Sequence, residues 1–119
     1  MLDEKHTLRN RKWLEEQQAR LTTELGDIHM VVDERPGYST HMADQASEVF
    51  EQAKNMAVTQ RLKHTLDEVN RALQKMDNGT YHLCDRCGGE IDQARLQALP
   101  HATLCMPCQT RAELHSRPR

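Results

Sequence analysis

The most constraining feature of this sequence is a pair of Cys-x-x-Cys motifs that hold all four of its cysteines, Cys84 with Cys87 and Cys105 with Cys108. Two thiolates spaced in this way can turn back on one tetrahedral metal ion, and a second pair completes its coordination. Seventeen residues separate the two pairs, a spacing typical of a structural four-cysteine zinc site. We therefore expect one structural Zn²⁺ that holds the fold together and takes no part in chemistry.

Two disulfides or a thiol redox site are the alternative uses of four cysteines. Disulfides belong to oxidising compartments, and the first residues do not resemble a secretion signal. A redox Cys-x-x-Cys usually occurs once and beside a βαβ pattern, and neither condition holds here. The zinc interpretation is therefore preferred.

Composition favours an elongated helical protein. Apolar residues make up 37% of the 119 residues and aromatic residues only 3%, whereas 29% are charged. So few apolar and aromatic residues favour long solvent-exposed helices stabilised by a metal over a compact globular domain. The formal net charge of −2 argues against a general affinity for nucleic acid. No apolar run is long enough to span a membrane, so we expect a soluble cytoplasmic protein.

Two long helices are predicted before the cysteines. Residues 1–32 place Leu14, Leu21, Leu25, Ile28 and Val32 on one face. Residues 42–77 form the second helix, whose predicted seam consists of Ala46, Val49, Ala53 and Met56, and then Leu62, Leu66, Val69, Leu73 and Met76. These two series are out of phase, so we expect the seam to drift around the helix near Val58. Pro36-Gly37 marks a turn between the helices, and Asn78-Gly79 ends the second one. Residues 1–77 are thus expected to form an antiparallel coiled-coil hairpin with its tip at about residues 33–44.

The remaining residues, 78–119, are expected to form the zinc module. Its small core is predicted to consist of Ile91, Leu96, Leu99 and Leu104. Asp92 is placed to cap a short helix over residues 93–98, which ends before Pro100. A last helix is expected over residues 107–115. The predicted fold class is therefore mainly α, with a long antiparallel two-helix coiled-coil hairpin, a small four-cysteine zinc-finger module and a short C-terminal helix.

Three further residues near the predicted finger are expected to have structural roles. Trp13, the only tryptophan, is predicted to pack the base of the hairpin against the finger. His82 and His101 lie close to the cysteines in sequence. Because four thiolates already complete a zinc site, we expect the two histidines to be neighbours of the metal rather than ligands.

The residues around the cysteines resemble a known family. The sequence carries the run Tyr81-His-Leu-Cys-Asp-Arg-Cys-Gly-Gly-Glu-Ile91, then Arg95-Leu96, Ala98, Pro100, Ala102, Leu104-Cys105 and Cys108. This pattern resembles the DksA/TraR C4-type zinc-finger family, and so do the long helical hairpin and the segment His41-Met-Ala-Asp44-Gln-Ala46. The resemblance covers residues 38–112 by sequence and the first helix only by type.

The resemblance implies a regulator of bacterial RNA polymerase that is not an enzyme. In DksA-like members the coiled coil enters the secondary channel, and a tip motif Asp-x-x-Asp-x-Ala approaches the active centre. Asp44 matches the second Asp of that motif and Ala46 the Ala, whereas His41 occupies the first Asp position. A histidine keeps hydrogen-bonding capacity but lacks a fixed negative charge.

The resemblance also bears on the alarmone guanosine tetraphosphate, which DksA binds together with polymerase. The basic residues that contribute to that site are matched here by Glu68, Leu99 and Gln109. Phosphate recognition needs Lys or Arg at such points. The site is therefore expected to be absent or weakened.

Two alternative functions stay open at this point. One is a zinc-containing coiled-coil interaction protein without polymerase control, a function that the histidine at position 41 favours. The other is a zinc-ribbon nucleic-acid binder, against which the net charge and the few aromatic residues argue.

Overall fold

The protein is described here by a computed structural model that covers residues 4–34 and 42–116, with side-chain surroundings for residues 4–28 and 48–115. Four helices account for most of this part of the chain: α1 (Glu4–Glu34), α2 (Met42–Asn78), α3 (Gln93–Ala98) and α4 (Met106–Ser116). The described ranges contain no β-strand beyond an isolated bridge between Leu83 and Glu90. The mainly α class is confirmed.

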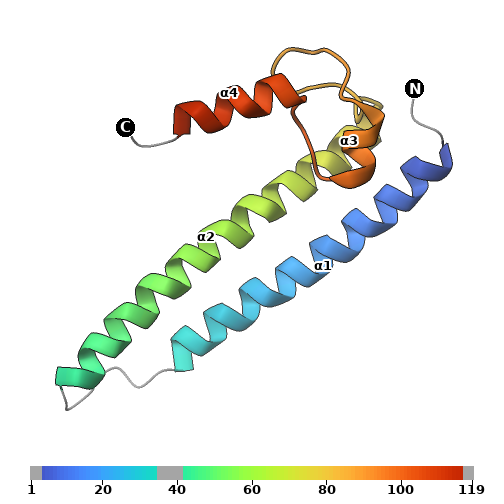
Figure 1. The fold of residues 1–119 in the computed structure, drawn as a ribbon. Helices are drawn as coiled ribbons and strands as arrows, with labels where there is room; N and C mark the ends of the chain where they lie inside the picture. The colour runs from blue at the N-terminus through green and yellow to red at the C-terminus, as the bar shows by residue number, and fades with distance from the viewer. Residues whose placement is uncertain (1–3, 35–41, 117–119) are drawn as a thin grey trace.

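Helices α1 and α2 run antiparallel and form the long body of the molecule (Figure 1). The molecule measures 61 × 36 × 20 Å along its principal axes. The finger lies where α1 begins and α2 ends, and α4 points from the finger back towards the other end of the hairpin (Figure 1). The expected tip at residues 33–44 falls largely outside the described residues. The boundary between the hairpin and the finger at residues 77 and 78 stays a prediction.

The hairpin core is concentrated in the half near the finger. Leu14 and Leu21 of α1 and Val69 and Ala72 of α2 are at most 1% exposed. Polar contacts flank this core and define the antiparallel register. Arg11 donates to Asp77 at 2.5 Å, and Gln18 donates to Asn70 at 2.6 Å.

The predicted seam of α2 is wrong in its first half. Val49 and Met56 are 65% and 64% exposed. The half-buried positions of this stretch are polar instead: Glu48, Glu51, Asn55 and Thr59. They continue the three- and four-residue steps back from Leu62, whereas Val49 and Met56 lie one position away from this series and Ala53 two positions away. The helix therefore keeps one phase along its length without the expected drift near Val58, and its early apolar residues lie on the outer face.

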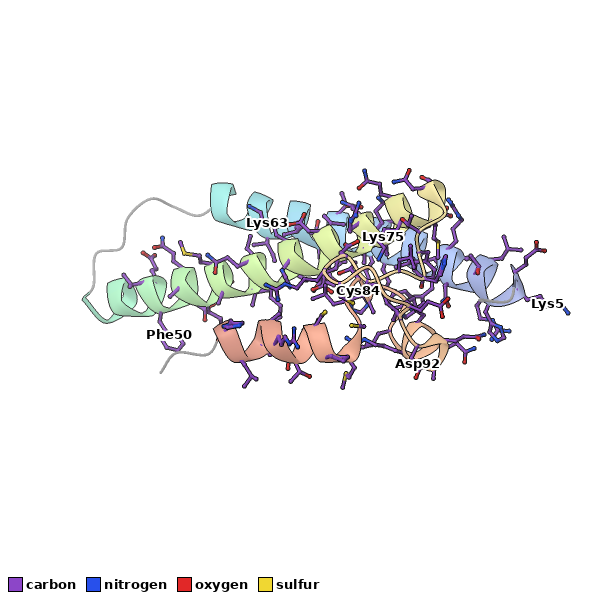
Figure 2. The ribbon with its side chains drawn as sticks, turned by 90° about the horizontal axis from the view of Figure 1, so that it is seen from above. Lys5, Phe50, Lys63, Lys75, Cys84 and Asp92 are labelled. Carbon is purple, nitrogen blue, oxygen red and sulfur yellow. The ribbon has the colours of Figure 1, made fainter. Side chains whose placement is uncertain are left out.

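The register also limits how far α1 can cover α2. In the antiparallel alignment set by the two cross-helix contacts, Glu34 lies level with residues near Lys54. The first turns of α2 extend past the end of α1, as Figure 1 shows. Phe50, labelled in Figure 2, lies on this projecting part and is 71% exposed.

The core predicts a contrast between two identical substitutions on α1. Leu21→Ala should lower the free energy of unfolding by about 2–5 kcal/mol, because it leaves a cavity in the packed half of the hairpin. Leu8→Ala should change it by no more than about 0.5 kcal/mol, because Leu8 is 68% exposed. Urea unfolding of the zinc-loaded protein, followed by helical circular dichroism, measures both. Equal losses for the two variants would contradict this description of the core.

Candidate metal centre

The four cysteines come together as predicted. Their Sγ atoms all lie within 4.8 Å of one another, and the Sγ atoms of Cys87 and Cys105 are 3.7 Å apart. Tetrahedral coordination with Zn–S bonds of about 2.3 Å needs sulfur atoms about 3.8 Å apart. The quartet therefore fits one zinc ion. Among the residues that the structure describes, no other group of three or more His, Cys, Asp or Glu side chains converges in this way.

The first cysteine pair is held by a tight backbone turn. The N–H of Cys84 donates to the carbonyl of Gly89 at 2.8 Å, and Gly88 donates back to Cys84 at 3.1 Å. Gly88 has a φ of +74°, a backbone conformation that residues other than glycine rarely adopt. The N–H groups of Arg86 and Gly89 point at the sulfurs of Cys84 and Cys87, each at 3.4 Å. Such N–H groups stabilise negative charge on sulfur.

The second pair spans the start of α4. Cys105 directly precedes the helix and Cys108 lies in its first turn, where the N–H of Gln109 donates to the Cys105 carbonyl at 2.9 Å. Pro107 occupies the first turn, a position that does not need its missing N–H. The two pairs are joined by a bond from the N–H of Asp85 to the carbonyl of Thr103 at 2.9 Å.

The thiols of the quartet differ in burial and in acidity. Cys84 and Cys108 are buried, whereas Cys87 is exposed. Burial would raise the pKa of Cys84, but N–H groups of Cys87, Cys105 and Arg86 and the Cys108 thiol together lower it to about 6. Hydrogen bonding with Cys105, burial and the other neighbouring thiols raise the pKa of Cys108 to about 12. A metal that binds all four sulfurs must therefore displace the proton of Cys108.

The small core beside the quartet differs from the prediction at one position. Ile91 and Leu96 are buried, and Leu104 packs against the buried cluster to which they belong, as expected. Leu99 is 40% exposed, because it follows the last residue of α3 and faces outward. Asp92 caps α3 as predicted, with its side chain accepting from the N–H of Ala94 at 3.4 Å.

Trp13 joins the hairpin to the finger, as the sequence predicted. Its ring stacks on the imidazole of His101, with centroids 5.9 Å apart and an interplanar angle of 19°. The Nε2 atom of His101 points elsewhere, lying 3.7 Å from a carboxylate oxygen of Glu68. Neither His82 nor His101 belongs to the converging sulfur cluster.

Two buried polar residues that hold the finger on the hairpin were not predicted from the sequence. Asn10 of α1 is 5% exposed and donates to the Tyr81 hydroxyl and to the Leu96 carbonyl, both at 3.2 Å. Tyr81 in turn donates to the carbonyl of Pro100 at 2.7 Å. Burial raises the pKa of Tyr81 to about 12, so this hydroxyl keeps its proton and acts as a donor.

The second of these residues is Lys75 of α2, which is 1% exposed. It donates to the carbonyls of Leu83 and Thr103, and its ammonium group lies 3.4 Å from the Asp85 carboxylate. Arg71 donates to both oxygens of Asp85, at 2.9 and 3.0 Å. Hydrogen bonding from Arg71, helped by Lys75, lowers the pKa of Asp85 although partial burial opposes the shift.

The sequence contains a weak signal for Lys75. Val69, Ala72 and Lys75 follow each other at three-residue steps, and all three are buried. Hydropathy alone predicts that a lysine is exposed to solvent, so the predicted series of buried positions ends at Ala72. Only the position of the finger over the end of α2 shows that the series includes Lys75.

The predicted tip residues are placed only in part. Asp44 and Ala46 belong to the first turns of α2, at the end of the hairpin away from the finger (Figure 1). Their side chains, and the whole of His41, lie outside the described residues.

A cleft of about 660 Å³ separates α4 from α2 and α3. Glu68, Leu99 and Gln109, the three positions singled out for the alarmone, all line it. Glu68 accepts from His64 at 2.7 Å within α2, and Gln109 donates to Glu113 at 3.1 Å within α4. Arg95 also lines the cleft, but its guanidinium donates to the Leu104 carbonyl at 3.1 Å.

Comparison with known proteins connects this geometry to a family. Residues 79–114 match the model of the prokaryotic dksA/traR C4-type zinc finger. General stress protein 16O of Bacillus subtilis is 38% identical over 93 residues, which cover 78% of this chain and 53% of that protein. The RNA polymerase-binding transcription factor DksA of Haemophilus influenzae is 33% identical over 63% of this chain and 52% of its own length. The chain thus spans about half the length of these two relatives.

A solved structure extends the similarity to the whole fold. The transcription factor DksA2 from Pseudomonas aeruginosa superposes with a TM-score of 0.75 at 28% identity, over 98% of this chain and 89% of that one. The RNA polymerase-binding transcription factor DksA of Buchnera aphidicola is 26% identical over 98% of this chain and 77% of its own length. The family finger and the quartet geometry together make the centre a C4 site for one zinc ion. Among the described residues, no helix has the length and apolarity that crossing a membrane requires.

The thiol acidities predict how zinc binding depends on pH. At pH 7.5, binding should release at least one proton, from Cys108, because its pKa of about 12 keeps it protonated without metal. Below a pH of about 6, Cys84 is protonated as well, so more protons compete and zinc affinity should fall more steeply. Titration calorimetry in buffers of different ionisation enthalpy counts the protons. Binding without proton release at pH 7.5 would contradict the assignment.

Proposed function

Because this chain belongs to the DksA/TraR C4-type zinc-finger family, we propose that it is a DksA-like transcription regulator that binds bacterial RNA polymerase through the secondary channel. The observation that carries the proposal is that the resemblance to transcription factor DksA2 includes the hairpin as well as the finger, over 98% of the chain. The proposed site of action is the cytoplasm, where polymerase works.

The proposed mechanism is steric and electrostatic. Zinc, when bound, supplies a structural crosslink between the two cysteine pairs and no reaction chemistry. Asn10, Lys75 and Trp13 then hold the finger on the base of the hairpin. The hairpin delivers Asp44 to the region of the catalytic Mg²⁺ of polymerase, where a carboxylate shifts the balance of promoter complexes.

The outer face of α2 supports a role in reaching a partner. We call Val49, Phe50, Ala53, Met56 and Ala57 the outer stripe; all five are exposed. Their spacing of three and four residues places them along one side of the helix. Apolar residues gathered on one exposed helix face are typical of a surface that meets a protein. We propose that the outer stripe lies against the wall of the polymerase channel.

The cleft beside α4 supports a weak or absent response to guanosine tetraphosphate. Glu68 and Glu113 line it, and their carboxylates repel phosphate groups. Calorimetry of the polymerase complex, with and without the alarmone, is expected to give the same affinity for this protein. A tenfold gain with the alarmone would contradict the proposal.

Asp44 tests the proposed mechanism at the tip. Asp44→Asn should leave polymerase affinity within about twofold of the parent and abolish the effect on transcription, because only the carboxylate charge is removed. The matched control is Asp67→Asn, which removes an exposed carboxylate from the middle of α2. Affinity is measured by polarisation of a labelled protein, and activity by multiple-round transcription in vitro.

Two outcomes separate the candidate functions. If the parent protein does not bind polymerase at micromolar concentration, the proposal fails. If it binds without changing transcription, an interaction protein without polymerase control becomes the better description, in line with His41 in place of the first tip aspartate.

Phe50 tests the outer stripe. Phe50→Ser should weaken polymerase binding about tenfold or more, because aromatic anchors carry much of the energy of an interface. It should leave the free energy of unfolding within about 0.5 kcal/mol, since the side chain is 71% exposed. Leu8→Ser is the control, because Leu8 is exposed to a similar extent, 68%, but lies at the base of the hairpin. Equal polymerase affinity for the two variants would remove the outer stripe from the interface.

A further inference from the structure

Lys75 is the largest of the fully buried side chains in the described part of the chain, with 1% of its surface exposed. A buried ammonium group costs several kcal/mol of desolvation unless charged or polar partners surround it. The placement of those partners therefore decides whether the folded state can hold this residue. Figure 2 shows Lys75 near the end of α2, close to the labelled Cys84.

All three partners of the ammonium group come from the finger. Leu83, whose carbonyl accepts from Lys75, directly precedes Cys84. Asp85, at 3.4 Å, lies inside the first cysteine pair. Thr103, whose carbonyl accepts at 3.5 Å, stands two residues before Cys105. The group thus contacts the backbone beside both metal-binding pairs.

The partners are also tied to one another. The carbonyl of Thr103 accepts from the N–H of Asp85 at 2.9 Å in addition to Lys75. The Asp85 carboxylate is held by Arg71, one helical turn before Lys75 on α2. Lys75 therefore finds its complete set of partners only when both cysteine pairs occupy their folded positions at the same time.

We infer that Lys75 is a positioning residue that couples metal occupancy of the four-cysteine site to the seating of the finger on the hairpin. A metal that holds the two cysteine pairs together also holds the acceptors of Lys75 together. The coupling is reciprocal. Lys75 raises the affinity of the site for metal by the same factor by which bound metal raises the equilibrium constant for docking the finger on the hairpin through Lys75. Residues outside a metal site that orient its ligands typically change affinity about 10- to 100-fold.

The alternative is that Lys75 stabilises the fold without regard to metal. In that case its replacement lowers stability equally with and without zinc. Coupling requires a difference between the two states, because a metal that holds the two cysteine pairs together also holds the acceptors of Lys75 together. The inference does not depend on polymerase binding, so it can fail or hold separately from the proposed function.

The test compares Lys75→Met with Lys63→Met in the full chain. Methionine keeps the length and apolar stem of lysine and removes the donors, and Lys63 is an exposed lysine earlier in α2 (Figure 2). Metal affinity is measured with Zn²⁺ against a chromophoric chelator, and the ligand set with the absorption spectrum of bound Co²⁺. Lys75→Met should bind Zn²⁺ about tenfold more weakly with an unchanged tetrathiolate spectrum. Lys63→Met should stay within about twofold of the parent.

A second measurement separates coupling from plain destabilisation. Amide hydrogen exchange in the last turns of α2 should speed up in the parent when zinc is removed, and much less so in Lys75→Met. Equal zinc affinity of Lys75→Met and the parent, or an equal response of both to zinc removal, overturns the inference. If Lys75→Met does not fold, Arg71→Met replaces it, since it removes the two bonds that fix the Asp85 carboxylate beside Lys75. Parental zinc affinity in that variant also overturns the inference.

Discussion

The contact between the helix ends of the hairpin and the backbone of the finger is the one on which the rest of the structure depends. Two helices cannot by themselves fix the direction of a small module at their end. Here Asn10 of α1 and Lys75 of α2 donate from buried positions to carbonyls of the finger, namely those of Leu96, Leu83 and Thr103. Because an unpaired buried donor is costly, these bonds favour one orientation of the finger over others.

This arrangement divides the hairpin into two halves with different tasks. Near the finger, α1 and α2 share a buried apolar core around Leu14, Leu21 and Val69. Towards the other end, α2 presents polar residues at its half-buried positions and apolar ones on its outer face, and it extends past α1. The base is therefore built for stability. The half of α2 away from the finger presents apolar surface that is not buried within the fold. This is the property expected of a segment that contacts a partner.

Much of this architecture could be predicted, but not the half-buried face of α2. Helix lengths, the Asp92 cap and the cysteine cluster follow from local rules of spacing, capping and coordination. The phase of the seam does not. Val49, Ala53 and Met56 form a regular apolar series, and a seam is normally assigned to such a series. The structure assigns them to the outer face because the face that begins at Leu62 and Val69 continues unbroken through Thr59 and Asn55.

The sequence by itself determined the metal site, the two long helices and the family, because four thiolates at fixed spacing and long helical periodicities act over short stretches of chain. Only the tertiary structure decided the roles of Asn10, Lys75 and Asp85. Their partners lie between 8 and 86 residues away along the chain, and the most distant bond joins Asn10 to Leu96. Local sequence patterns predict that a charged or amide side chain is exposed to solvent. It is buried and holds two segments together only when the fold places a distant backbone carbonyl within hydrogen-bonding distance of it.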